Sequence, residues 1–339
     1  MKKNVSLKDI ANEVGVSASL VSYVLNGHAK EKRVGDEIAQ KVIKTAQRLS
    51  YVPNQIAKSL KTKKSHTIGF IVGEIYYRFT IDITRSIESQ AKKSGYTVII
   101  GNSHEDLPTL RELIDVLINR QVDGLIIIAA EKAEAEVEYL KKREIPFVLI
   151  DRNFPKIETN YIGIDNYKVA YKATEYLIKL KRKAIAFVNY STTFFHLQER
   201  NRGYFQAMKD YKLHSNKSLH KQIRKSFFNE DIKQAIAELT SGNVTCDAVF
   251  FATDTLAING LKNLVELKVN IPDDIAVFSF DESEAFALFS IPVTYYRQPL
   301  EEIGKSAVNL LLEIMNDIKH TEQICLESTL VIGKSCGEK

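Results

Sequence analysis

The hydrophobic and polar positions of residues 6–27 predict two short helices separated by a tight turn. Apolar residues recur at helical spacing before Gly15, and a second such series follows Ser17. Ser6 and Asp9 have the spacing of a capping box, and Ser17 is a suitable cap for the second helix. The predicted inner face consists of Ile10, Ala11, Val14, Val21, Val24 and Leu25. Two helices closed on each other in this way form a helix-turn-helix.

A third helix is predicted from Asp36 to Ser50, and its apolar stripe would complete a small core. The stripe consists of Ile38, Val42, Ile43, Ala46 and Leu49. Beyond it, Pro53 breaks the chain and Asn54 can cap a short helix that runs to Leu60. A helix of this length is not stable alone in water, so we expect it to form only when packed or bound.

From residue 67 onward, short apolar runs alternate with helical stretches, which predicts an α/β fold with parallel sheets. The first runs are TIGFIVG, YTVIIGN, DGLIIIA and IPFVLIDR, and the pattern resumes with AIAFVN, CDAVFFA and IAVFSFDE. The two halves resemble each other, because IPFVLID ends at Asp151 as IAVFSFD ends at Asp281. Two similar Rossmann-like lobes imply a cleft between them.

Candidate ligand-binding residues follow from the rule that open α/β sheets bind ligands beyond the carboxyl ends of their strands. Sugar recognition needs polar groups for the hydroxyls and an aromatic face for the ring. The predicted effector-binding residues are Tyr76, Phe79, Arg152, Asn189, Arg200, Asp254 and Asp281; Tyr77 and Phe280 are further aromatic candidates. Each aspartate taken alone is also consistent with a helix cap or a loop residue.

The charge of the chain is concentrated at its start. Residues 1–66 hold 13 Lys and Arg against 5 Asp and Glu, a net charge of +8, whereas the remaining 273 residues hold 34 against 37, a net charge of −3. A basic segment on a nearly neutral body indicates a polyanionic partner for that segment, the alternative being a solvated lysine-rich face. Small residues at Ala18 and Ser19 would let the second helix approach base edges closely.

Several protein classes are disfavoured. No run of about 18 apolar residues exists, and the first residues lack a signal-peptide pattern, so we expect a cytoplasmic protein without a membrane span. The three cysteines are widely spaced and read as reduced thiols, and no metal-ligand motif occurs. Nucleotide-binding glycine motifs and a nucleophile elbow are absent. We therefore expect no enzyme activity, no cofactor and no metal.

As a set, several segments make the chain resemble the LacI/GalR (lactose-repressor) family of bacterial transcription regulators. They are LKDIANEVGVS, VSYVLNG, YVPNQIAKSL, TIGFIV, VDGLIII, FVLIDR, IGIDNYKVA, ERNRGY, TDTLAINGLK, IPDDIAVFSFDE and VTYYRQPLEEIGKSAVNLLL. The resemblance implies a helix-turn-helix headpiece at residues 1–53, a hinge helix and linker at 54–66, and a two-lobed, periplasmic-binding-protein-like core for effector binding and dimerisation at 67–339. It also implies that Arg200 and Asp281 occupy effector-binding positions.

The resemblance further implies that the second helix reads the DNA major groove and that Leu60, with Ala57, enters the minor groove. The predicted DNA-binding residues are Leu7, Lys8, Ser17, Ala18, Ser19, Ser22, Tyr23, Asn26, Tyr51, Asn54, Ala57, Lys58 and Leu60. Composition alone favours the alternative that the lysines around Leu60 belong to a flexible linker.

Three departures from the family pattern bear on specificity. The family most often has arginine where this chain has Tyr23, and tyrosine cannot form the bidentate contact with guanine, so the operator should differ. The loop HAKEKR after Gly27 is basic and is expected to add phosphate contacts. The family's Ser-Asn-Pro-Phe is replaced by Tyr-Tyr-Arg-Phe at residues 76–79, so the ligand cannot be carried over. Arg78 there would favour an acidic or phosphorylated sugar unless it points to solvent.

The function expected from these observations is that of a homodimeric repressor. It would bind a pseudo-palindromic double-stranded DNA operator and respond to a small sugar-like effector held between the lobes. Two alternatives keep the same fold: a regulator that responds to a protein partner or to no ligand, and a cytosolic sugar-binding module. A periplasmic sugar-binding protein would share the core but would need a signal peptide and would have no use for residues 1–60.

Overall fold

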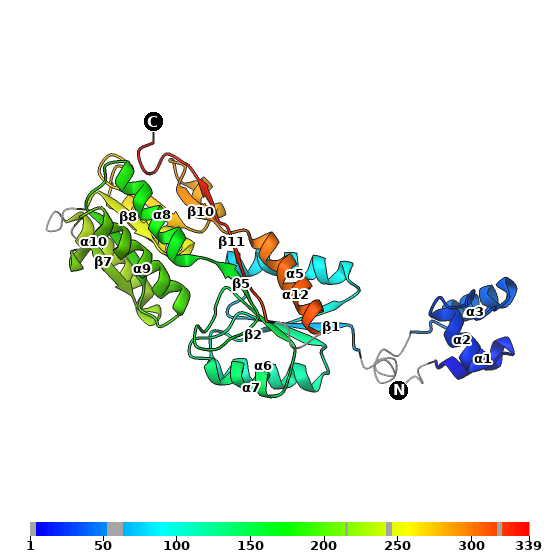
Figure 1. Ribbon diagram of the computed structural model, residues 1–339. Helices are drawn as coiled ribbons and strands as arrows, with labels where there is room; N and C mark the ends of the chain where they lie inside the picture. Colours follow the sequence, from blue (N-terminus) through cyan, green and yellow to red (C-terminus); the bar gives the residue numbers. More distant parts are fainter. Residues whose placement is uncertain (1–4, 53–63, 214–215, 242–245, 317–320, 339) are drawn as a thin grey trace. The chain divides into compact units, whose positions relative to one another are not determined.

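The computed structural model describes residues 5–52, 64–213, 216–241, 246–316 and 321–338 (Figure 1). The chain divides into two compact units, Met1–Ser65 and His66–Lys339, and each unit has its own core. None of the described helices is long and apolar enough to cross a lipid bilayer.

The described residues of the first unit form three helices, α1 (Leu7–Val14), α2 (Ala18–Leu25) and α3 (Asp36–Arg48). At the start of α1, the Asp9 amide donates to the Ser6 hydroxyl (3.3 Å) and the Asp9 carboxylate accepts from the Ser6 amide (2.7 Å), which completes a capping box. Gly15 ends α1 in the left-handed conformation, with φ of 80°, and so allows the tight turn. The predicted helix-turn-helix is confirmed.

The core of the first unit is small, and the predicted stripe of α3 is only partly correct. Its fully buried apolar residues are Ile10, Ala11, Val21, Val24, Val42 and Ala46. Ile38 and Ile43 stay 42% exposed, contrary to the prediction. The physical reason is that α1 and α2 cover only one face of α3, and Val42 and Ala46 already occupy that face.

The second unit contains two six-stranded sheets of matching order, as Figure 1 shows in part. The first has the order β11-β5-β4-β3-β1-β2, with β1 (Thr67–Val72), β2 (Thr97–Asn102), β3 (Gly124–Ile127), β4 (Phe147–Ile150), β5 (Tyr161–Ile164) and β11 (Gln323–Leu326). The second has the order β12-β10-β9-β8-β6-β7, with β6 (Ile185–Tyr190), β7 (His220–Ile223), β8 (Ala248–Phe251), β9 (Ala276–Phe280), β10 (Thr294–Arg297) and β12 (Thr329–Val331). All neighbouring strands are parallel except the antiparallel pair β10–β12.

Helices flank both sheets, which explains why β3, β4, β8 and β9 are buried along their whole length and read as continuous apolar runs. The first lobe carries α5 (Arg78–Lys93), α6 (Leu107–Asn119), α7 (Glu134–Lys142) and α12 (Leu300–Ile314). The second lobe carries α8 (Asn166–Lys179), α9 (Phe195–Asp210), α10 (Phe228–Thr240) and α11 (Asp254–Glu266), with short 3₁₀ turns at Lys217–Leu219, Lys225–Phe227 and Glu284–Leu288. Figure 1 shows α12 lying beside α5, although the two helices are far apart in sequence.

The chain crosses between the lobes three times: between β5 and α8, between β10 and α12, and between β11 and β12. The two lobes are therefore not successive segments of sequence, because α12 and β11 return to the first lobe. Gln298, in the second crossing, lines the cavity described below.

Candidate functional site

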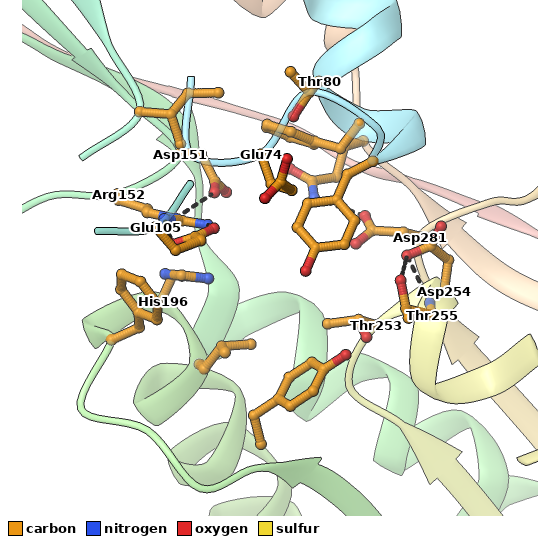
Figure 2. A pocket seen from close by; sticks show the side chains of 18 of the residues that line it. Glu74, Thr80, Glu105, Asp151, Arg152, His196, Thr253, Asp254, Thr255 and Asp281 are labelled. Atoms are coloured by element: carbon orange, nitrogen blue, oxygen red, sulfur yellow. Dashed lines mark hydrogen bonds and ion pairs between the residues drawn. The ribbon is translucent and has the colours of Figure 1, made fainter. Parts of the chain in front are cut away.

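A cavity of about 730 Å³, counted to its open mouth, lies between the two lobes (Figure 2). Its walls come from segments that follow strands β1, β2, β4, β6, β8 and β9, as the rule for parallel sheets predicts. Of the seven predicted effector residues, the structure places five in its lining, namely Phe79, Arg152, Arg200, Asp254 and Asp281.

Arg200, on α9, is held firmly at the floor of the cavity. The residue is 2% exposed, and its Nε donates to Asn166 Oδ1 (2.8 Å) while Nη1 donates to the Ala252 carbonyl (2.5 Å). Its guanidinium lies 3.5 Å from the Phe280 ring centre, and Nη1 lies 3.7 Å from Asp281 Oδ2. Burial lowers the pKa of Arg200, and the carboxylate of Asp281 opposes this shift. Phe280 therefore supports Arg200 and does not itself line the cavity.

Asp151 and Asp281 occupy equivalent places at the ends of β4 and β9. Both have left-handed backbones, with φ of 64° and 71°. Burial raises the pKa of each carboxyl to about 6, and the positive charge of Arg200 acts against the increase. Gln298 Nε2 donates to Asp281 Oδ1 (2.6 Å) and fixes its orientation. The similarity of the two strand ends was visible in the sequence, although only Asp281 was predicted to bind effector.

Arg152 forms an ion pair inside the cavity with a residue that sequence reasoning missed. Its Nη1 and Nη2 donate to the two carboxylate oxygens of Glu105 (2.6 and 2.7 Å). Burial acts to raise the pKa of Glu105, but the charge and hydrogen bonds of Arg152 outweigh it, and the pKa is lowered. Glu105 follows β2 by three residues, so inspection of the end of that strand could have found it. The Phe194 ring lies 4.3 Å from the Arg152 guanidinium.

Two predicted residues do not line the cavity. Tyr76 is 68% exposed, and the adjacent Tyr77 lines the cavity in its place. Asn189 is fully buried, and its amide donates to the Leu197 carbonyl (3.0 Å) and to Asn201 Oδ1 (3.1 Å). Because neighbouring side chains alternate along a strand, it is Tyr190 that faces the cavity. In both cases the residue that lines the cavity is the one directly after the predicted residue.

Arg78 also lies outside the cavity lining, so the argument that it favours an acidic sugar was wrong. Its Nε pairs with Asp82 (2.6 Å) on its own helix, and its Nη1 pairs with Glu284 (2.6 Å) of the second lobe. Other side chains also join the lobes directly. Thr192 donates to Glu131 (2.8 Å), and Lys225 lies 4.0 Å from Glu105.

The outer face of α2 is a separate candidate site, on the first unit. Tyr23 is 39% exposed and lies outside the buried core, and Lys32 Nζ is 5.4 Å from its ring centre. Ser19 is exposed, whereas Ser22 and Ala18 are partly buried. The structure therefore presents a tyrosine with a neighbouring cation, where the family pattern has arginine.

The remaining predicted DNA-binding residues differ in their surroundings. Ser17 accepts from the Leu20 amide (3.2 Å), and the Asn26 amide donates to the Ser22 carbonyl (2.8 Å), so both also stabilise the ends of α2. Lys8 is exposed, while Leu7 and Tyr51 pack partly against the core. The hinge residues Asn54, Ala57, Lys58 and Leu60 lie outside the described residues.

Comparisons with known proteins cover the whole chain. Residues 6–54 match the family model of bacterial regulatory proteins, lacI family, and residues 174–336 match a periplasmic binding protein-like domain. The structure of the lac repressor dimer bound to operator and the anti-inducer ONPF superimposes with a TM-score of 0.88 at 21% identity, covering 98% of this chain and 99% of that one. This likeness confirms the predicted fold.

Curated relatives are similar along nearly their full length. The chain is 30% identical over 322 residues to the HTH-type transcriptional repressor PurR of Vibrio vulnificus (strain CMCP6), covering 94% of both chains. It is 29% identical over 332 residues to the ribose operon repressor of Haemophilus influenzae (strain ATCC 51907 / DSM 11121 / KW20 / Rd), covering 97% of this chain and 98% of the relative. These relatives are transcriptional repressors and not enzymes. The chain therefore belongs to the lacI family of bacterial regulatory proteins.

Proposed function

We propose that this protein is a sequence-specific transcriptional repressor whose affinity for its operator is controlled by a small polar effector bound between the lobes. The observation that carries the proposal is the combination of two sites in one chain. A helix-turn-helix with an open face lies within a segment of net charge +8, and a ligand-sized cavity lies in a separate unit. A cytosolic sugar-binding module would have no use for the first of these sites.

The cavity favours a small molecule over a protein partner or no ligand. Its lining joins buried charged groups, including Arg200 and Asp281, to the aromatic side chains of Tyr77, Phe79 and Tyr190. Burying charged groups is costly unless they are paired, so a polar ligand that bonds to them would recover part of that cost. Hydroxyl groups and a ring face fit this combination, which supports a sugar or sugar-like effector.

We further propose that the repressor acts as a homodimer. Two copies of the headpiece would bind two half-sites, and the effector would change their spacing by favouring one arrangement of the lobes. Side chains from both lobes line the cavity, for example Phe79 from the first and Arg200 from the second. The contacts of a ligand bound there change when the lobes move. The ligand therefore binds one lobe arrangement more tightly than the other, and this difference shifts the equilibrium between them.

Selection of random DNA duplexes by the full-length protein tests the DNA-binding function. We expect a pseudo-palindromic site, because two equivalent headpieces read two half-sites. Affinity for that site should fall steeply with salt, by roughly 10³- to 10⁵-fold between 50 and 200 mM if 6–10 phosphates are contacted. Enrichment of no symmetric sequence, or binding that does not depend on salt, would contradict the proposal.

Replacement of Tyr23 tests the proposed reading face. We expect Tyr23→Ala to weaken operator binding and to leave the melting temperature almost unchanged, because the ring lies outside the buried core. Tyr23→Arg should move the base preference toward guanine, since arginine adds a bidentate donor pair. Val21→Ala is the comparison, because Val21 is fully buried and its truncation should lower the melting temperature. A large loss of stability in Tyr23→Ala with unchanged DNA binding would show that the ring is structural.

A further inference from the structure

The cavity and its mouth both carry more negative than positive side chains. Five carboxylate residues and three cationic residues line the cavity. A second hollow at the mouth shares Phe79, Asp254, Asp281 and Gln298 with the cavity, and six carboxylate residues and two arginines line it. An approaching ligand therefore meets surplus negative charge at the mouth and again inside, which attracts cations and repels anions.

The cationic side chains of the cavity are already occupied by carboxylates. Arg152 is bound at both Nη atoms by Glu105, and Lys225 lies 4.0 Å from the same carboxylate. Arg200 bonds to Asn166 and to the Ala252 carbonyl and lies 3.7 Å from Asp281. An anionic ligand that bonds to Arg152 would have to break its ion pair with Glu105 and leave that buried carboxylate without its main partner.

The two arginines at the mouth are paired in the same way. Arg78 contacts Asp82 and Glu284, each at 2.6 Å, and Arg297 bonds to Glu282. Among the described residues, each arginine around the cleft therefore lies within 4 Å of a carboxylate, and Lys225 is the least engaged cation, with Nζ 4.0 Å from Glu105.

Asp254 is a carboxylate of the cavity that lacks an arginine or lysine partner among the described residues; Glu74 is another, and its only ion pair among them is with His104 (3.6 Å). Asp254 is the first residue of α11, and its Oδ1 accepts from the Thr255 amide (2.7 Å). Within the described residues it takes part in no ion pair. Figure 2 shows it beside Asp281, at the end of the cavity away from Arg152 and Glu105. Burial raises the pKa of Asp254, and the charge of Asp254 raises the pKa of Asp281 further. A ligand cation between the two carboxylates would remove this repulsion.

A second feature of the cavity also points to a ligand with hydrogen-bond donors. His196 is 7% exposed and lines the cavity, and its Nδ1 is buried without a hydrogen-bond partner among the described residues. Burial and the nearby arginines hold the pKa of His196 well below its usual range, so the ring is neutral. A neutral imidazole nitrogen can accept from a hydroxyl group. His196 lies at the Arg152 end, opposite Asp254 (Figure 2).

We propose that the effector is a small polyhydroxy compound with a primary amine, an amino sugar being the fitting class, and that its ammonium group lies between Asp254 and Asp281. The ring hydroxyls then extend toward His196. This inference rests on the proposed effector function and adds the charge of the ligand to it. It replaces the acidic or phosphorylated sugar that Arg78 had indicated.

The test compares sugars of one series that carry a positive charge, no charge or a negative charge. Full-length protein is titrated at pH 7 and constant ionic strength with D-glucosamine, D-glucose and D-glucuronate, and with the galactose and mannose counterparts, and thermal stabilisation and Kd are measured. We expect an amine to bind with a Kd about 10- to 100-fold lower than its neutral counterpart, as for hydrogen bonds to a charged group. The uronate of the same series should bind most weakly.

Asp254→Asn should remove the preference for the amine over its neutral counterpart, because asparagine keeps the shape and the acceptor for the Thr255 amide but carries no charge. Asp231→Asn is the matched control, since Asp231 pairs with Arg224 on the surface of the same lobe. Asp254→Ser is a second variant, and unfolding curves verify that each protein is folded.

Each outcome decides the inference. A neutral or anionic sugar that binds best and shifts operator affinity overturns the amine assignment and leaves the proposed function in place. An amine preference that persists in Asp254→Asn overturns the assignment of the ammonium site. If none of the amines stabilises the protein, the inference is wrong, and operator selection then tests the repressor function separately.

Discussion

Asp281→Asn is expected to abolish the response of operator affinity to the effector. Asp281 accepts from Gln298 and lies beside Arg200, so it joins the second lobe to a crossing segment at the point where ligand would bind. Asparagine has the same size but no charge and only one acceptor oxygen, so it loses the attraction to the buried guanidinium and weakens the bond to a ligand donor. The ligand would then bind the two lobe arrangements with equal affinity. Because only a difference in affinity can shift the equilibrium between the arrangements, the ligand would no longer change it.

The measurement is an operator titration with and without effector. Coupling between two sites is typically about 1–3 kcal/mol, so wild-type protein should show roughly a 5- to 150-fold change in operator affinity. The variant should show none, while its affinity without effector stays within a few-fold because the headpiece is a separate unit. Arg200→Ala should behave in the same way, although truncation also leaves Asn166 and the Ala252 carbonyl without their partner.

Asp210→Asn serves as the control for this prediction. Asp210 lies at the end of α9 and accepts from the Tyr171 hydroxyl (3.1 Å) on the surface of the second lobe. The Asp210→Asn variant should respond to effector as the wild type does. If Asp281→Asn and Arg200→Ala both keep a full response to the true effector, the effector site lies elsewhere in the chain.

The sequence predicted the fold well because its local signals agree with one another. The capping box at Ser6 and the left-handed glycine at Gly15 are determined by residues within a few positions, so the helix-turn-helix could be read directly. The buried central strands gave continuous apolar runs for the same reason. The antiparallel pairing of β12 could not be predicted, because a strand of three residues carries too little sequence pattern to indicate its direction.

The candidate site was predicted less completely, and the errors have a common cause. The end of a strand cannot be located from sequence to the single residue, and side chains alternate between faces at each step. Asn189 and Tyr76 were therefore chosen where Tyr190 and Tyr77 line the cavity. Glu105 was missed because its importance comes from Arg152, which is 47 residues away in sequence and touches it only in the folded lobe.

Gly203→Ala is expected to cause a large loss of stability in the second lobe. Gly203 lies on α9 where this helix crosses α8, and an added Cβ would lie 2.3 Å from the Tyr167 carbonyl oxygen and 2.9 Å from the Tyr171 nitrogen. Both are backbone atoms, so relief requires the two helices to separate. Overpacking of this kind typically costs about 1–3 kcal/mol, and close backbone contact puts this site at the upper end. Replacement of glycine within a helix would otherwise gain roughly 0.5–1 kcal/mol.

The direction of the change in stability therefore distinguishes the effect of the close backbone contact from the effect of helix propensity. We expect the melting temperature of Gly203→Ala to fall by several degrees, at roughly 2–4 °C per kcal/mol for a unit of this size. Gly35→Ala is the matched control, because its backbone has an ordinary φ of −62° and an added Cβ meets no atom within 4 Å; its effect should stay below about 1 kcal/mol.

Gly203→Ala should also reduce the response to effector, because α9 carries Arg200 one turn earlier and Arg200 bonds to Asn166 at the start of α8. Separation of the helices stretches that bond and moves the guanidinium away from Asp281. A variant with an unchanged or higher melting temperature would mean that α8 and α9 separate without cost. In that case the close approach of the two helices would not be what positions Arg200 in the cavity.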